Sequence, residues 1–150
     1  MIEINNLTKE KIDERFLKKV AKIVLKGESM EKENLSIVLV DENKIRELNK
    51  KYRKKNKPTD VLSFGNIQDS KYQIPNSSIN EIVICPQIVK KNAKKFATGY
   101  NKELARVLIH GILHILGYEH EKNKKEADKM KNKEEYYLSK IWQKFATLLV

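Results

Sequence analysis

The chain has 150 residues, a length that suits one domain with its own hydrophobic core. Hydrophobic residues make up 40% of the sequence, and charges interrupt the apolar runs before any reaches the roughly 20 residues that a membrane span needs. The amino-terminal stretch MIEINNLTKE lacks the basic flank and apolar centre of a signal peptide. We therefore expect a single domain over residues 1–150, in a soluble cytoplasmic protein with no membrane partner.

The net charge is +11, from 31 basic and 20 acidic residues, and such an excess favours a polyanionic partner. The charge is uneven along the chain. Between residues 50 and 57, KKYRKKNK holds six basic residues and no acidic one, whereas EKNKKEADKMKNKEE, at 121–135, mixes both signs. We interpret the first stretch as a binding patch and the second as the solvated face of a helix.

In the first half of the chain, apolar patterns predict two strands, each followed by a helix. IEI near the start is a short strand, and Thr8 is predicted to cap a helix that ends at Gly27. LSIVLV, at 35–40, is a buried strand. Asp41 then begins a helix with Tyr52 on its apolar side, and the Lys57-Pro58 pair interrupts it.

The second half begins with strand DVLSF, at 60–64, and a loop over residues 66–80. The fourth strand is EIVIC, in which Cys85 is expected to be a buried structural thiol. Pro86 suits the first turn of a helix that runs to about Ala97.

Two further helices are predicted: Asn101 caps one that ends at Gly117, and the last spans about 122–146. The apolar face of the last helix is predicted to contain Met130, Tyr137, Leu138, Ile141 and Phe145. The order of elements predicts a small layered α/β or α+β domain. Of these we favour an α+β fold, a single layered domain with a small mixed sheet of about four strands packed by helices.

All three histidines of the chain lie in HGILHILGYEH, at 110–120. Residues four apart on a helix differ by about 40° in azimuth, so His110 and His114 share one face. Gly117 can end the helix in a left-handed conformation and return His120 toward the same point. Three imidazoles with open positions around one ion are typical of a catalytic zinc site, because structural zinc is usually closed by four protein ligands.

The spacing is that of the zinc peptidase motif H-E-x-x-H-x-x-G-x-x-H, except that Gly111 stands where the catalytic glutamate would be. Gly111 has no side chain to take a proton from water, which argues against a peptidase. Glu119 is the alternative base in such an enzyme. Its simpler role is that of a carboxylate that orients an imidazole.

HGILHILGYEH, together with LNKKYRKKNKPTDVLSF at 48–64, resembles the YbeY family of bacterial endoribonucleases, which act in ribosomal RNA maturation and ribosome quality control. The resemblance extends from about residue 35 to 120 and implies that His110, His114 and His120 bind one zinc ion. It also implies that Arg53 is functionally important, and it places Thr59 and Asp60 in the segment PTDVLSF. Two departures are Glu119, where the family usually has aspartate, and Asn80-Glu81, where it usually has Gly-Asp.

An open zinc site can assist phosphodiester cleavage, and Arg53 can bind a phosphoryl oxygen pair through a fork that lysine lacks. We therefore assign Arg53 and His114 as catalytic. Tyr52 either stacks on an unpaired base or, as its register favours, packs in the core. The expected substrate-binding residues are Lys50, Lys51, Lys54, Lys55, Lys57 and Thr59. A second basic face comprises Lys90, Lys91, Lys94 and Lys95.

The sequence thus favours a metal-dependent, single-strand-specific endoribonuclease in maturation of 16S ribosomal RNA and ribosome quality control. The resemblance implies RNA as substrate, and small-subunit ribosomal proteins and a ribosome-associated GTPase as partners. Two alternatives remain: a zinc metallopeptidase, and a non-enzymatic ribosome-assembly factor that binds RNA and uses zinc for its fold.

Overall fold

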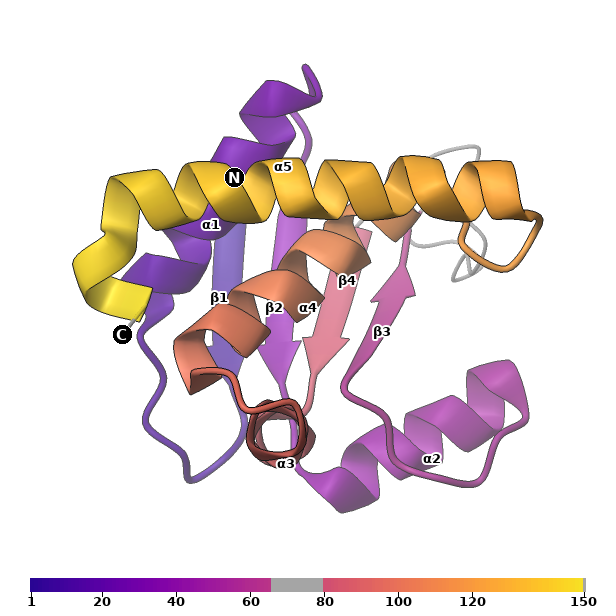
Figure 1. The fold of residues 1–150 in the computed structure, drawn as a ribbon. Helices are drawn as coiled ribbons and strands as arrows, with labels where there is room; N and C mark the ends of the chain where they lie inside the picture. Colours follow the sequence, from indigo (N-terminus) through magenta and orange to yellow (C-terminus); the bar gives the residue numbers. More distant parts are fainter. Residues whose placement is uncertain (66–79, 150) are drawn as a thin grey trace.

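The structure, a computed structural model, describes residues 1–65 and 80–149, with side chains through residue 144. Within these residues one sheet holds four strands in the order β1-β2-β4-β3. The strands are β1 (Ile2–Asn6), β2 (Leu35–Leu39), β3 (Val61–Phe64) and β4 (Asn80–Ile84). β1, β2 and β4 run parallel, and β3 pairs antiparallel with β4 (Figure 1). The predicted α+β class with a small mixed sheet is confirmed.

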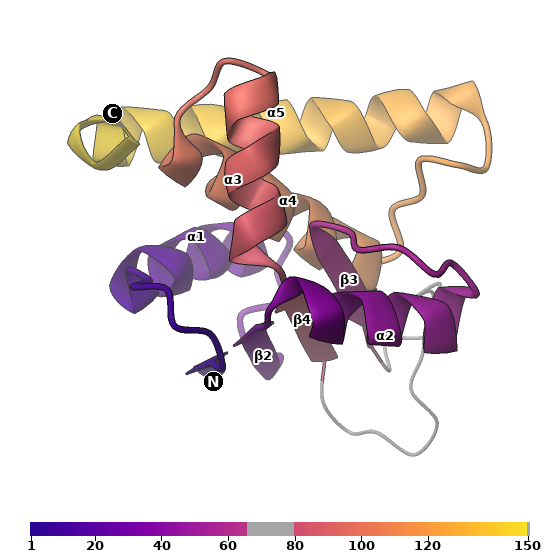
Figure 2. The same cartoon turned by 90° about the horizontal axis from the view of Figure 1, so that it is seen from below.

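Most of the helices lie on one face of the sheet (Figures 1 and 2). The bounds are α1 (Glu14–Gly27), α2 (Glu42–Arg53), α3 (Pro86–Lys95), α4 (Tyr100–Ile115) and α5 (Lys124–Leu149). Side chains alternate between the faces of a strand, so Ile37 and Ile82 join the main core with α1, α4 and α5. Leu62 and Val83 join a smaller core with Ile45 of α2. The site described below forms where α4 crosses β3 and β4.

The helix starts agree only in part with the sequence predictions. Asp41 caps α2 as predicted, since its carboxylate accepts a hydrogen bond from the Lys44 backbone N–H at 2.9 Å. The Thr8 cap is wrong: Thr8 donates to the Asn6 side chain at 2.6 Å, and α1 starts only after Asp13, whose carboxylate accepts from Phe16 N–H.

The predicted Asn101 cap is wrong as well, because Asn101 already lies inside α4. Gly99 occupies the cap position and its carbonyl accepts the Glu103 N–H at 3.0 Å. The final helix is capped by Asn123, whose side chain accepts from Glu126 N–H at 2.9 Å. Asn followed three residues later by Glu is a capping signal that the sequence carried.

The end of α2 differs from the prediction. The helix stops at Arg53, and Lys54 adopts the left-handed conformation with φ 60°, so the break precedes the Lys57-Pro58 pair. The buried Asn49 amide donates to the Lys57 carbonyl at 2.8 Å. This bond holds the end of the basic segment, which is the stretch of residues 50–57, back against α2.

Other predicted features are confirmed where the structure describes them. Cys85 is fully buried, and burial raises the pKa of its thiol. On α5, Met130, Tyr137 and Ile141 are buried and Leu138 is partly buried against the same core. Residues 66–79 of the predicted loop and the Phe145 side chain lie outside the described part, and Asn80 belongs to β4. No described helix carries an apolar stretch long enough to cross a membrane.

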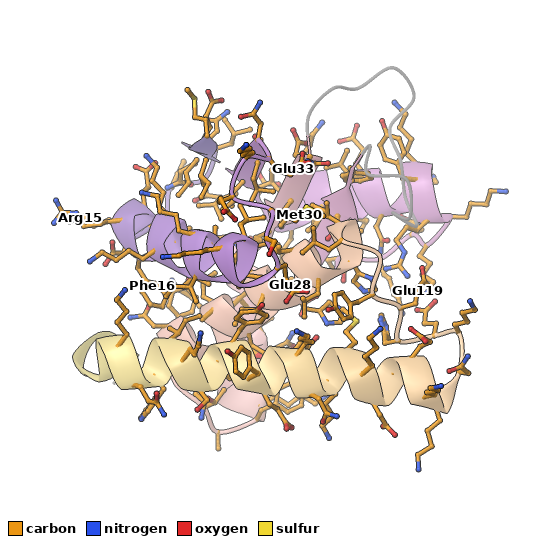
Figure 3. The ribbon with its side chains drawn as sticks, turned by 90° about the horizontal axis from the view of Figure 1, so that it is seen from above. Arg15, Phe16, Glu28, Met30, Glu33 and Glu119 are labelled. Atoms are coloured by element: carbon orange, nitrogen blue, oxygen red, sulfur yellow. The ribbon has the colours of Figure 1, made fainter. Side chains whose placement is uncertain are left out.

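A buried carboxylate connects the end of α1 with α5 and the loop after α4 (Figure 3). Glu28 follows α1, and its side chain is 10% exposed. It accepts hydrogen bonds from Tyr118 at 2.6 Å, from Tyr137 and from Lys133 at 3.2 Å. Burial alone would raise the pKa of Glu28, but these donors outweigh burial and lower it.

We expect Glu28→Gln to lower the free energy of unfolding by about 2 kcal/mol at pH 7, because hydrogen bonds to a charged acceptor are lost. The folded pKa of Glu28 lies below its ordinary value of 4.5. The contribution of Glu28 to the free energy of unfolding is therefore complete above pH 4.5, and it is lost as pH falls through the folded pKa. Urea unfolding of both proteins, in chelator, should show a difference that shrinks on acidification. The exposed neighbour Glu31→Gln serves as control, and an equal effect there would contradict the role of Glu28.

Candidate metal centre

The three histidines converge at one point between α4 and the loop that follows it. His110 and His114 project from one face of α4, with their Nε2 atoms 3.0 Å apart. The chain then turns at Gly117, which has φ 99°, and the Gly117 N–H donates to the His114 carbonyl at 3.1 Å. This turn brings His120 back, so that one nitrogen of each imidazole lies within 4.8 Å of the other two.

The donor set fits a metal ion of zinc type. Zinc lies about 2.0–2.1 Å from imidazole nitrogen in tetrahedral geometry, which places two ligand atoms roughly 3.4 Å apart. The observed separations bracket this distance. His120 is 42% exposed, so the group opens to solvent on its side. Three ligands and an open side are typical of a catalytic rather than a structural site.

A carboxylate from α5 orients His110. Glu134 contacts His110 Nδ1, which leaves Nε2 to face His114. A ligating histidine usually makes such a bond through its other nitrogen. The sequence hypothesis assigned an orienting role to Glu119, which lies in the loop from α4 to α5 (Figure 3); the structure adds Glu134. The reading of residues 121–135 as a wholly solvated face is wrong at Glu134, whose side chain is 16% exposed.

Gly111 is a point of close packing between α4 and the sheet. A Cβ atom at this position would lie 3.1 Å from Ser63 Oγ, 3.2 Å from Ile82 Cγ2 and 3.3 Å from Val61 Cγ2. Ser63 also donates a buried hydrogen bond to the Gly111 carbonyl at 2.9 Å. A glutamate here would be directed into β3 and β4, so this packing excludes the base that the zinc peptidase motif requires.

The histidines and Arg53 line the same cavity, which has a volume of about 290 Å³. Arg53 Nη2 lies 3.7 Å from Glu121 Oε1, which is also 3.7 Å from His120 Nε2. Thr59 lies in the wall as well, and its hydroxyl donates to Asp60 at 3.4 Å. The described lining comprises Arg53, Thr59, Asp60, Val61, Leu62, Ser63, Arg106, Val107, His110, His114, His120 and Glu121.

The five lysines assigned to substrate binding are exposed around the end of α2 and are not part of the described lining. Tyr52, between them, packs edge-on to Phe64 at 5.0 Å in the smaller core, as its register favoured. In the second basic face, Lys90 lies 2.6 Å from Glu10 and Lys91 lies 2.8 Å from Glu42. Glu42 begins α2, so this face meets the opposite end of that helix from the basic segment.

Sequence and structure comparisons agree on one family. The model of the family Endoribonuclease YbeY matches residues 3–142. The chain belongs to the endoribonuclease YbeY family. It is 36% identical over 134 residues to endoribonuclease YbeY of Thermotoga petrophila, covering 89% of this chain and 78% of the relative. With endoribonuclease YbeY of Aquifex aeolicus the identity is 38% over 136 residues, covering 90% and 88%.

A solved structure shows the same fold. The solution structure of TM1509 from Thermotoga maritima matches with a TM-score of 0.68 and 32% identity, covering 98% of this chain and 93% of that protein. The resemblance stated from the histidine and basic motifs is thus confirmed. Membership in the YbeY family favours neither the peptidase nor the non-enzymatic alternative.

Of the two departures from the YbeY pattern, the Asn80-Glu81 pair has a structural role. Asn80 is buried, pairs with Leu35 in the sheet and donates to the Asn34 carbonyl at 3.2 Å. Glu81 pairs with Phe64 at the far end of β3 from the cavity, and burial raises its pKa. Both residues therefore belong to the sheet rather than to the described cavity lining.

Glu134→Gln should weaken metal binding about 10- to 100-fold, because the imidazole of His110 loses the acceptor that fixes its orientation and basicity. Metal affinity would be measured by competition with a chelator of known affinity. Glu135→Gln, one residue along α5 and exposed, is the matched control. Unchanged affinity in Glu134→Gln would show that the carboxylate does not tune the metal site.

Proposed function

We propose that the chain is a zinc-dependent endoribonuclease that cleaves single-stranded RNA and acts in the maturation of 16S ribosomal RNA and in ribosome quality control. The observation that best supports this proposal is that the three-histidine group and Arg53 line one open cavity. Family membership supports the reaction class. We further propose that residues 1–150 form one catalytic domain, with His110, His114 and His120 as ligands.

The residues of this cavity suit phosphodiester cleavage. His110, His114 and His120 would hold a zinc ion, which would supply Lewis acidity to a phosphoryl oxygen or to water. Negative charge grows on the phosphoryl oxygens in the transition state, and Arg53 can donate two parallel hydrogen bonds to them. Glu121 lies beside both Arg53 and His120, and it holds the guanidinium at the metal side of the cavity until a phosphate replaces it.

RNA reaches this cavity over the basic segment. Lys50, Lys51, Lys54, Lys55 and Lys57 flank Arg53 and are exposed, so they can contact phosphates without reading sequence. Thr59, in the wall, can donate to a phosphate oxygen.

The proposed partners and compartment are those that the resemblance to the YbeY family implies. We propose that the protein works in the cytoplasm on ribosomal precursors. Small-subunit ribosomal proteins and a ribosome-associated GTPase are the expected protein partners.

Cleavage of a labelled RNA with single-stranded and duplex segments tests the proposal. We expect Arg53→Ala to retain metal and lose about 100-fold or more in kcat/KM, as for removal of one transition-state donor. His114→Ala should lose both metal and activity. Arg46→Ala, on the exposed side of α2, is the control and should match wild type.

Equal cleavage by all these variants would indicate a contaminating nuclease. Absence of cleavage by metal-loaded wild type would favour the assembly-factor alternative. The product ends add a mechanistic result, because a 2′,3′-cyclic phosphate identifies the neighbouring 2′-hydroxyl as the attacking group.

The basic segment should dominate the salt dependence of RNA binding. Each phosphate contact contributes about 0.7 to the slope of log K against log salt for single strands, so Lys54→Ala/Lys55→Ala should reduce the slope by about 1.4. The control is Lys90→Ala/Lys91→Ala, two lysines already close to Glu10 and Glu42. Fluorescence anisotropy at several salt concentrations measures both, and an equal reduction in the control would refute a role specific to the segment.

A further inference from the structure

A second arginine, Arg106, lies in the wall of the metal cavity and has no part in the function assigned so far. It stands four residues before His110 on α4, one turn along the same helix face as the two histidine ligands. Its side chain remains 39% exposed although the backbone of α4 is in the core. The sequence signal was the i, i+4, i+8 spacing of Arg106, His110 and His114.

A buried carboxylate holds Arg106 by one edge. Arg106 Nε donates to Glu103 at 2.5 and 3.1 Å, and the Glu103 side chain is 2% exposed. A guanidinium has five N–H donors in a rigid fork. In the described part of the chain the hydrogen bonds of Arg106 use Nε, so its two terminal amino groups remain available to a ligand in the cavity.

Three carboxylates act on the charge of Arg106. Burial alone would lower the pKa of the guanidinium, but the Glu103 bond and the attraction of Asp60 and Glu134 raise it. Asp60 lies in the cavity lining, and Glu134 contacts His110 Nδ1. Arg106 is therefore a fixed cation at the edge of the site.

The two arginines lie near different histidines. Arg53 shares Glu121 with His120, at 3.7 Å from each, whereas Arg106 precedes His110 by about one helical turn, roughly 6 Å along α4. A strand whose scissile phosphate lies at the histidines and Arg53 would carry a neighbouring phosphate toward Arg106. Because Arg106 offers the edge geometry that a phosphate requires, its ligand would be this neighbour.

We propose that Arg106 binds a non-scissile backbone phosphate of the RNA, one nucleotide from the cleaved bond, and thereby fixes the register of the strand. This inference rests on the proposed function. The Glu103 carboxylate acts through Arg106, as a positioning residue that keeps the terminal amino groups directed into the cavity.

The test combines Arg106→Lys with single neutral methylphosphonates placed at each phosphate around a mapped cleavage position. Lysine keeps a cation beside Glu103 but lacks the fork. We expect Arg106→Lys to lower kcat/KM about tenfold through KM, with kcat, metal content and melting temperature unchanged. Neutralising one neighbouring phosphate should lower the kcat/KM of wild type about tenfold. It should lower the kcat/KM of Arg106→Lys less than about twofold, because that variant has already lost the contact.

A double variant, Glu103→Gln/Arg106→Gln, removes both members of the pair and leaves no buried carboxylate unpaired. It should show the same loss of dependence on that one phosphate. Arg46→Lys is the control, with wild-type kinetics on every RNA. The inference would be overturned if the effects of Arg106→Lys and of the methylphosphonate on kcat/KM multiplied at every phosphate, or if Arg106→Lys had wild-type kinetics. Either result would leave the proposed nuclease function unaffected. Absence of cleavage of the unmodified RNA by wild type would instead overturn the proposed function.

Discussion

The close contact of α4 with β3 and β4 is the constraint on which the site depends. Gly111 lets the helix lie against Ser63 and Ile82. The Ser63 hydroxyl donates to the Gly111 carbonyl and so fixes the distance between the helix and the sheet. One residue earlier, His110 faces the cavity whose other wall is formed by β3 and the end of α2. A larger residue at 111 would move α4 away and separate the histidines from Arg53. The same glycine that removes the peptidase base therefore assembles the cavity.

The third histidine depends on contacts beyond α4. Gly117 turns the chain, and Tyr118 then binds Glu28, which is also held by Lys133 and Tyr137 of α5. Burial and the bond to Glu28 raise the pKa of Tyr118, so its hydroxyl remains protonated and can donate at neutral pH. His120 follows two residues later. Its position thus reflects packing between α1, α5 and the loop as well as the local turn.

Sequence reasoning identified what local geometry determines. The spacing of His110 and His114, the turn at Gly117 and the cap at Asp41 each depend on a few neighbouring residues, and the structure shows all of them in place. Glu134 was missed because its partner His110 is 24 residues away, and a mixed-sign helix gives no sign of which member faces inward. Thr8 was misread because several polar residues precede α1, and only packing decides which one caps it.

The acidic residues of the cavity at first oppose an RNA function, since Asp60 and Glu121 line it and Glu103 and Glu134 support it. Each of them, however, has a hydrogen-bonding or basic neighbour: Glu134 contacts His110, Glu103 binds Arg106, Glu121 lies beside Arg53 and His120, and Asp60 attracts Arg106. Their effect is to fix cations and imidazoles in defined orientations. The exposed lysines of residues 50–57 lie outside the described cavity lining. Electrostatic attraction of RNA and positioning of its phosphates are therefore functions of different parts of the surface. The lysines attract a polyanion regardless of its sequence, and the cavity binds it only where its phosphates match the fixed donors.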